Sequence, residues 1–162
     1  MSGLVRPLSV DFGVRPWLML ALRELGTEEV RGGAASPRIL DFWSAVDGLE
    51  VDSDEVPWCA AFAAWCVDLA GFRSPRSARA LSWRGFGLTL TEPRVGSVVV
   101  FDHGGGRGHV GFLLGHYGDT CALLGGNQDD AVRVSLYKTR RVVGYQWPLP
   151  FDGCEVCDDA AH

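Results

Sequence analysis

The chain has 162 residues and a formal charge of −5 at pH 7, and 47% of its residues are hydrophobic. This length and apolar content predict a single globular domain with a buried core. The acidic balance, with no run of five or more basic residues, argues against nucleic acid as a partner. The longest apolar segments, around 60–67 and 95–101, are too short to span a bilayer, so membrane insertion is not expected.

The N-terminal stretch "MSGLVRPLSVDFGVRP" contains no apolar run of the length that a secretory signal needs. We therefore expect synthesis in the cytoplasm without a Sec signal. Residues 1–15 are interpreted as an N-terminal extension, 16–150 as the folded domain and 151–162 as an acidic C-terminal tail.

The first two predicted helices have clear start and stop signals. In "RPWLMLALRELG", Pro16 is placed near a helix start, apolar residues share one face, and Gly26 is placed at the C-cap. The second helix is expected over 37–46, with Ser36 as its N-cap and Gly48 closing it.

A third helix is predicted over 58–70, because small and apolar residues fill it without a breaker until Gly71. A short fourth helix is expected over 77–83. The first half of the chain is therefore predicted to be helical.

From Val95 onward, glycines separate β-rich runs: "GSVVVFD", "GHVGFLLGHY", "TCALLGG", "AVRVSLY" and "RVVGYQW". "DHGGGRG" is expected to be a flexible hairpin loop and "YGD" a tight turn. Helices followed by strands predict an α+β fold, in which N-terminal helices pack on a C-terminal antiparallel sheet of about five strands.

The chain has five cysteines, an odd number with no framework spacing, so a disulfide scaffold is not expected. Cys154 and Cys157 form a CxxC in the tail, but one such pair supplies at most half of a four-ligand zinc site. We predict no metal and no cofactor. A thiol-redox or zinc module built on this pair is kept as a minor alternative.

Cys59 and Cys66 lie in the third predicted helix, and their positions differ. A cysteine in the first turn faces unpaired backbone N–H groups and the positive end of the helix dipole, which favour the thiolate. On this basis we expect Cys59 to react well below the ordinary thiol pKa of about 8.5. The alternative is a buried packing thiol, and Cys66, about two turns further along, fits that interpretation better.

A nucleophilic thiol needs a base, and the chain has four histidines. His109 opens a strand in "GRGHVGFLLG", where flanking glycines let other groups approach closely. His103 and His116 are expected to be solvated, and His162 is the terminal residue. Asn127, in "LLGGNQDD", is a candidate to orient the base, although a Gly-Asn pair taken alone favours a turn.

Several segments together resemble a known family: "PWCAAF" within "DEVPWCAAFAAWCVDLAGF", then "EPRVGSVVVF", "GHVGFLLG", "GGNQDDAVRVS" and "VVGYQWP", in this order. Their order resembles that of the papain-like CHAP and NlpC/P60 superfamily of peptidoglycan hydrolases, in particular its small phage-associated and bacterial members. The resemblance covers most of the chain, from about Pro16 to Pro148. It implies a papain-like NlpC/P60 fold.

The resemblance also implies the site. Cys59 would be the nucleophile, with its backbone N–H in an oxyanion hole, His109 the general base and acid, and Asn127 the residue that orients His109. The activity implied is cysteine peptidase or amidase cleavage of an amide bond in the cell-wall peptide, through a thioester. Both an N-acetylmuramoyl-L-alanine amidase and a stem-peptide endopeptidase remain open, as does the second oxyanion donor.

Substrate contacts are expected from Trp58, Asp54, Trp83 and Gln128, with Trp43 and Tyr117 as further aromatic candidates. Asp52, Asp54 and Glu55 form an acidic lip before the nucleophile. Such a lip would suit the free amine of a diaminopimelate-type stem peptide, and a solvated loop is the simpler account.

The implied partner is the peptidoglycan stem peptide, and the implied place of action is the periplasm or cell wall, after release or delivery. An endolysin-like enzyme and a secreted antibacterial toxin both fit, the latter with an immunity protein or a delivery machine as partner. The alternative function is a non-catalytic wall-binding or phage-tail structural module with the same fold.

Overall fold

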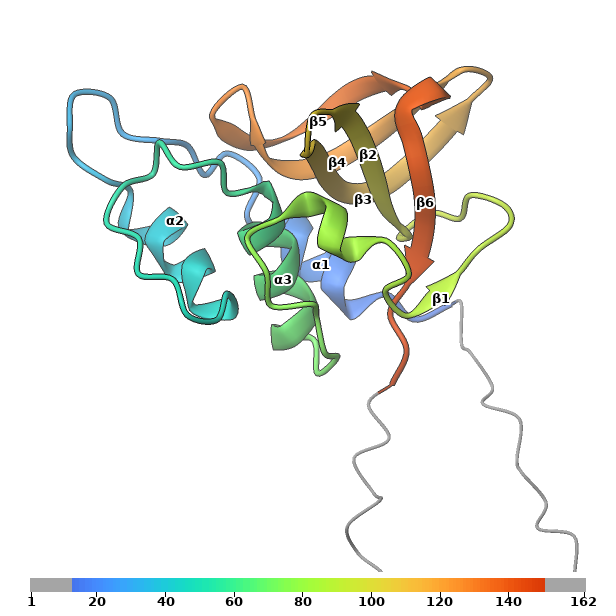
Figure 1. Cartoon of the computed structure of the whole chain (residues 1–162), viewed down its shortest axis with the longest axis horizontal. Helices are drawn as coiled ribbons and strands as arrows, with labels where there is room; N and C mark the ends of the chain where they lie inside the picture. Colours follow the sequence, from blue (N-terminus) through green and yellow to red (C-terminus); the bar gives the residue numbers. More distant parts are fainter. Residues whose placement is uncertain (1–12, 151–162) are drawn as a thin grey trace, which may run out of the picture.

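The computed structural model describes residues 13–150, so most of the expected N-terminal extension and the whole acidic tail, with Cys154 and Cys157, lie outside the described residues. The α-helices are α1 (Pro16–Arg23), α2 (Pro37–Phe42) and α3 (Cys59–Leu69), and the 3₁₀ helices are η1 (Trp43–Ala45), η2 (Ala80–Trp83) and η3 (Thr139–Arg141). The strands are β1 (Leu88–Thr89), β2 (Val98–Gly104), β3 (Arg107–Tyr117), β4 (Thr120–Gln128), β5 (Ala131–Lys138) and β6 (Val142–Trp147). Figure 1 shows the helices gathered beside one strongly curved sheet.

The starts of the first two predicted helices are confirmed, and their ends are not. α1 begins at Pro16, and α2 begins after Ser36, whose hydroxyl accepts a 3.4 Å hydrogen bond from the Ile39 N–H. α1 ends at Arg23, before the predicted Gly26 cap. α2 tightens into η1 after Phe42, because 3₁₀ geometry commonly closes a last turn.

Helix α3 lies in the middle of the protein, and most of its surface is buried. Its four alanines are almost fully buried, so neighbouring elements approach its backbone from several sides. Gly71 ends it with a φ of +89°, as the sequence predicted. The predicted fourth helix is only the single turn η2.

The sheet is antiparallel throughout and has six strands in the order β1-β6-β2-β3-β4-β5, where about five were predicted. The extra strand, β1, has two residues, too few to carry a readable period. The "DHGGGRG" segment is mostly strand, because only Gly105 and Gly106 turn between β2 and β3. The tight turn at Gly118–Asp119 is confirmed.

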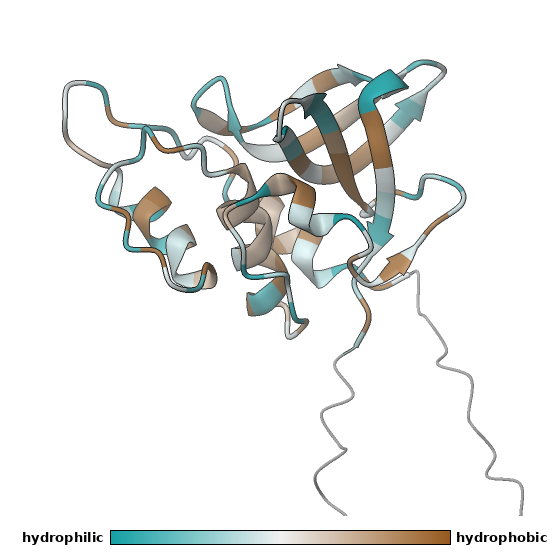
Figure 2. Cartoon of the chain, viewed as in Figure 1, coloured by the Kyte–Doolittle hydropathy of each residue, from teal (hydrophilic) through white to brown (hydrophobic). Residues whose placement is uncertain are grey.

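Alternation along the strands gives the sheet two apolar sides. One side packs on the helices and carries Val98, Val100, Val110, Phe112 and Leu124. The other, which we call the inner side, carries a second cluster made of Val99, Phe101, Leu113, Cys121 and Leu123. Figure 2 shows hydrophobic (brown) stretches along β2 and β6 and hydrophilic (teal) residues at the upper ends of both strands.

The curvature of the sheet brings distant strands together on the inner side. β2 and β5 are three places apart in the sheet, which would separate them by about 14 Å if it were flat. The rings of Phe101 on β2 and Tyr137 on β5 are nevertheless 5.1 Å apart between centroids. The inner side is therefore concave, and side chains from β2, β3, β4 and β5 converge on it.

Candidate active site

Cys59 is the first residue of α3, and this end of the helix lies directly on β4. The contact depends on Gly126, where a Cβ atom would lie 2.6 Å from the Trp58 ring and 2.8 Å from Phe62 Cβ. The backbone N–H of Val110 on β3 lies close enough to the Cys59 sulfur to lower the pKa of its thiol. Since Val110 directly follows His109, the helix start and the histidine strand meet at this point.

The thiol of Cys59 is 7% exposed, and this burial changes the expectation from sequence. Burial raises the pKa of the Cys59 thiol, and hydrogen bonds from the backbone N–H groups of Val110, Ala60 and Cys59 itself offset only part of that rise. The prediction that the helix start lowers this pKa was wrong, because desolvation outweighs the N–H donors. The resting cysteine is a neutral thiol.

His109 projects from β3 toward the inner side, where it is 8% exposed. Its Nε2 lies 2.9 Å from Oε1 of Gln128. The carboxamide nitrogen of Gln128 donates to two carbonyl oxygens, of Leu123 at 3.1 Å and of Arg133 at 2.7 Å. The carboxamide orientation is therefore determined, and the group facing His109 is an acceptor.

This arrangement selects one tautomer of His109. Because Gln128 Oε1 only accepts, the hydrogen bond requires a proton on Nε2. In the neutral ring Nδ1 is then unprotonated and free to accept a proton. Gly125 leaves the space for this pair, since a Cβ there would lie 2.6 Å from Gln128 Oε1 and 3.5 Å from His109 Nε2.

The sequence predicted Asn127 as the residue that orients His109, but the hydrogen bond comes from the next residue, Gln128. The register of β4 shifts between Gly125 and Gln128, and Asn127 adopts a φ of +55° inside this irregularity. Regular alternation from Gly125 would place Asn127 on the inner side. Because of the bulge, the side chain of Gln128 lies on the inner side instead, where it is 2% exposed.

The pKa of His109 is also shifted toward the neutral form. Burial lowers it, the hydrogen bond with Gln128 raises it in part, and the nearby His103 lowers it further. Burial thus favours an uncharged thiol and an uncharged imidazole at rest. Such a pair can perform general-base chemistry, in which the proton moves from sulfur to imidazole as the sulfur attacks.

All four of the predicted substrate contacts are buried in the protein, and so is the further candidate Trp43. Gln128 is the partner of His109 described above. Trp58 is 0% exposed, and its indole N–H donates to Glu29 Oε1 at 2.9 Å. Trp83 is also 0% exposed and packs edge-to-face on Phe86, 4.7 Å between ring centroids. Asp54 is 3% exposed. The structure therefore gives these side chains packing roles.

The carboxylate of Asp54 holds the long loop before α2 in place. Its Oδ2 accepts from the backbone N–H groups of Val30 at 2.9 Å and Ser36 at 2.8 Å. These hydrogen bonds lower the pKa of Asp54. Of the predicted acidic lip, Glu55 lines a cleft, as described next.

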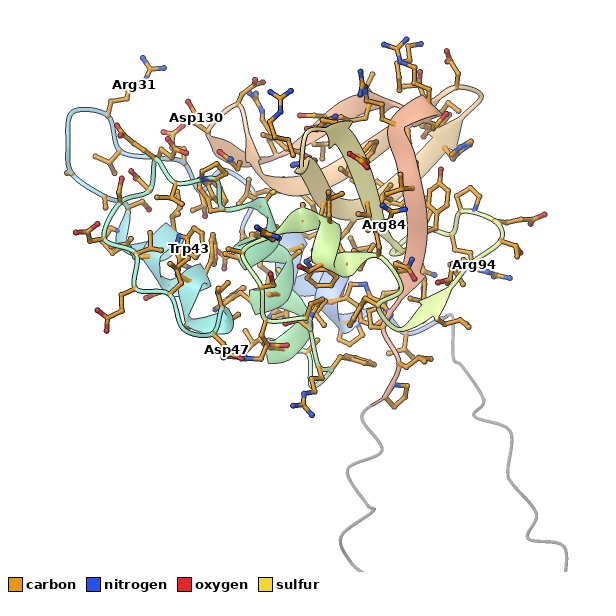
Figure 3. The ribbon with its side chains drawn as sticks, viewed as in Figure 1. Arg31, Trp43, Asp47, Arg84, Arg94 and Asp130 are labelled. Atoms are coloured by element: carbon orange, nitrogen blue, oxygen red, sulfur yellow. The ribbon has the colours of Figure 1, made fainter. Side chains whose placement is uncertain are left out.

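An acidic cleft of about 700 Å³ lies next to the start of α3. Its charged lining residues are Glu28, Glu29, Arg31, Glu55, Asp129 and Asp130. It adjoins the candidate site at two points, because Glu29 bonds Trp58, the neighbour of Cys59, and Asp129 follows Gln128. Figure 3 shows Arg31 on the long loop and Asp130 on the neighbouring β4–β5 turn.

The remaining candidates lie apart from this arrangement. Cys66 is 0% exposed in the middle of α3, which fits the packing interpretation. Tyr117 is 67% exposed at the end of β3. Within residues 13–150, no group of three or more His, Cys, Asp or Glu side chains is placed to hold a metal ion. No helix in the same range is long and apolar enough to cross a membrane.

Comparison with known families locates one match in the chain. Residues 51–127 match the family model of the CHAP domain. The matched stretch contains Cys59 and His109, and it ends one residue before Gln128. No curated protein matches the chain.

Proposed function

Residues 51–127 match the CHAP domain family, and from this match we propose that the protein is a peptidoglycan hydrolase that cleaves an amide bond of the cell-wall peptide. The observation that carries the proposal is the meeting of three groups. The N–H of Val110 acts on the Cys59 thiol, and the preceding residue, His109, is held by Gln128. This is the nucleophile, base and orienting group that thiol acyl transfer requires.

The reaction begins with a neutral pair. Nδ1 of His109 takes the thiol proton while the Cys59 sulfur bonds to the substrate carbonyl carbon. The imidazolium then donates this proton to the amide nitrogen, the C–N bond breaks and the amine leaves. A water molecule next gives a proton to His109 and bonds to the carbonyl carbon of the thioester. The C–S bond then breaks, and His109 returns the proton to the Cys59 sulfur, which restores the neutral pair.

The start of α3 supplies a donor for the negative oxygen that forms during attack. Since Cys59 is the first residue of the helix, its backbone N–H has no acceptor within the helix. We assign this N–H to the oxyanion hole, where a preorganised donor stabilises the transition state more than the ground state.

Gln128 acts in both proton transfers. Its Oε1 keeps the Nε2 proton in place, and it stabilises the imidazolium that forms when Nδ1 is protonated. The same carboxamide is tied to Leu123 and Arg133, so little reorganisation is needed during the reaction.

Two substrate bonds remain open in this proposal: the N-acetylmuramoyl-L-alanine amide and an amide within the stem peptide. We propose that the protein acts on the peptidoglycan stem peptide in the periplasm or cell wall. It would reach this place as an endolysin-like enzyme, or as a toxin with an immunity protein or a delivery machine as partner. The endolysin-like enzyme and the toxin would differ in their route to the cell wall, and both would use the same active-site chemistry.

The test is digestion of purified sacculi by the full chain, followed by mass spectrometry of the soluble fragments. Muropeptides with a newly freed amine and carboxyl group identify the cleaved bond and separate amidase from endopeptidase. Cys59→Ala is expected to release none of them, with Cys66→Ala as the matched control on the same helix. Equal fragment release by Cys59→Ala and wild type would contradict the proposal and favour a non-catalytic wall-binding module.

A further inference from the structure

A second side chain contacts the imidazole of His109, and it comes from the edge strand β5. The ring of Tyr137 stacks on the imidazole, with 5.2 Å between centroids and 23° between planes. The Tyr137 hydroxyl oxygen lies 3.4 Å from His109 Nε2, the same nitrogen that donates to Gln128. One ring nitrogen is thus faced by both a carboxamide oxygen and a phenol oxygen.

The position of Tyr137 is fixed from behind. Its ring contacts Phe101 on β2 at 5.1 Å between centroids, and Phe101 is 1% exposed. Phe101 also lies 6.3 Å from the imidazole, which completes a three-ring cluster on the concave side of the sheet. The curvature of the sheet, which brings β5 over β2, therefore places a phenol on a histidine of a different strand.

We propose that Tyr137 is a positioning residue that holds the imidazole of His109 against Gln128 and stabilises its protonated form during acyl transfer. The inference rests on the proposed function, because it concerns the base of that reaction. It adds a residue beyond the stretch 51–127 that matches the CHAP family.

The physical reason is the cost of charging a buried ring. Burial disfavours the imidazolium that must form when His109 accepts the thiol proton. An aromatic face against a cation recovers part of this cost, more where both are desolvated. The phenol oxygen is a second acceptor for the Nε2 proton, while burial raises the pKa of Tyr137 to about 12 and keeps the phenol itself neutral.

Other titratable groups around this ring pair belong to several elements. His103 on β2 acts on His109, and Cys59 on α3, Cys121 on β4 and Asp129 at the β4–β5 turn act on Tyr137. Cys59 is neutral at rest, and Cys121 is a buried thiol whose pKa is raised. The NMR titration must therefore follow the ring signals of His109 and His103 separately.

The experiment is a proton NMR titration of the His109 ring in the full chain, together with kcat and KM on sacculus-derived muropeptides. Tyr137→Leu removes the aromatic face and the hydroxyl, and Tyr137→Phe removes only the hydroxyl. Tyr145→Leu is the matched control, because Tyr145 packs on the same inner cluster, whereas the ring contacts of His109 are with Phe101 and Tyr137. Tyr137→Ile replaces Tyr137→Leu should the latter not fold.

Tyr137→Leu is expected to lower the pKa of His109 further, by about half a unit to one unit. It is expected to reduce kcat by about 3- to 10-fold with KM unchanged. In Tyr137→Phe, the pKa of His109 and kcat should both lie closer to wild type than in Tyr137→Leu. Tyr145→Leu should change neither quantity.

An unchanged His109 titration in Tyr137→Leu would overturn the inference even if the enzyme cleaves sacculi. If Tyr137→Leu lowers the pKa of His109 as expected but the wild-type protein cleaves no sacculi, the proposed function is overturned. The contact between Tyr137 and His109 then still stands. The two failures are therefore distinguishable. A loss in Tyr145→Leu equal to that in Tyr137→Leu would reduce the effect to general packing and also contradict the inference.

Discussion

His109 and Gln128 are joined by a 2.9 Å hydrogen bond whose direction is set by the carbonyl oxygens of Leu123 and Arg133. These two acceptors occupy the carboxamide nitrogen of Gln128, so only its oxygen can face the imidazole. A buried amide, 19 residues away in sequence, thereby determines which nitrogen of His109 is the base.

Gln128→Leu is expected to reduce kcat/KM by about 10- to 100-fold, because it leaves the buried Nε2–H of His109 without this acceptor. The measurement is muropeptide release at saturating and low substrate. Asn127→Gly is the matched variant, since glycine tolerates the φ of +55° found there. A loss in Asn127→Gly equal to that in Gln128→Leu would return the orienting role to Asn127.

The acid limb of the pH–rate profile is expected below pH 6.5, the ordinary value for histidine, because burial lowers the pKa of His109. The base must be unprotonated to accept the thiol proton, so a lowered pKa extends activity to more acidic pH. The check is kcat/KM across pH 4 to 8 in buffers of constant ionic strength. An acid limb above pH 6.5 would contradict the buried, neutral histidine.

The pH midpoint of Cys59 alkylation by iodoacetamide is expected above the ordinary thiol value of about 8.5, because burial raises the pKa of this thiol. Cys66, whose pKa is raised well above that value, should stay unlabelled until the protein unfolds. Labelling is located by peptide mass spectrometry of the native protein. Rapid labelling of Cys59 at neutral pH would indicate a resting thiolate, as the helix position alone suggested.

Gly125→Ala is expected to reduce kcat by at least about 10-fold, because the new Cβ would displace the Gln128 carboxamide from His109. Gly115→Ala is its control on the neighbouring strand, where the new Cβ meets the exposed Tyr117 ring, which can turn away. Circular dichroism separates a local effect from unfolding. Unchanged activity in Gly125→Ala would mean that the pair tolerates a shifted carboxamide.

Asp54→Ala is expected to lower the free energy of unfolding by about 2–3 kcal/mol, since it leaves the backbone N–H groups of Val30 and Ser36 without their charged acceptor. The lowered pKa of Asp54 gives the sign of the pH effect. Its stabilising contribution is complete above the ordinary carboxyl value of 3.8 and is lost as pH falls through the lower folded value.

Urea unfolding at pH 7 and at pH 3 tests both statements about Asp54. The difference in stability between wild type and Asp54→Ala should shrink at the lower pH. A solvated lip residue, as one interpretation of the sequence had it, would give no measurable difference at either pH.

The sequence predicted the order of elements well because its signals are local. Pro16 and Ser36 mark helix starts through backbone chemistry that needs no tertiary contact. β1 escaped prediction because Leu88 and Thr89 are paired only by the distant β6. The second helix was predicted too long, because α2 ends at Phe42 and the following turn is the 3₁₀ helix η1. Local sequence signals do not distinguish these two helix types.

The candidate site was predicted in part. Cys59 and His109 stand in motifs whose positions on a helix start and a strand could be read from sequence. Gln128 could not be assigned, because a bulge shifts the side-chain alternation of β4 by one residue. The run of left-handed residues, Asn127, Asp129 and Asp130, is the local signal that regular pairing ends there.

The nucleophile and its base come from opposite halves of the chain, and they meet only where Gly126 lets the start of α3 rest on β4. A ribosome must therefore release β3 and β4 before the thiol has a proton acceptor, and a nascent helical half carries a cysteine without its catalytic base. Acyl-transfer activity at Cys59 is thus a property of the completed assembly. Because burial raises the pKa of the folded thiol, the loss of Cys59 alkylation during refolding would time the docking of the two layers, independently of any substrate.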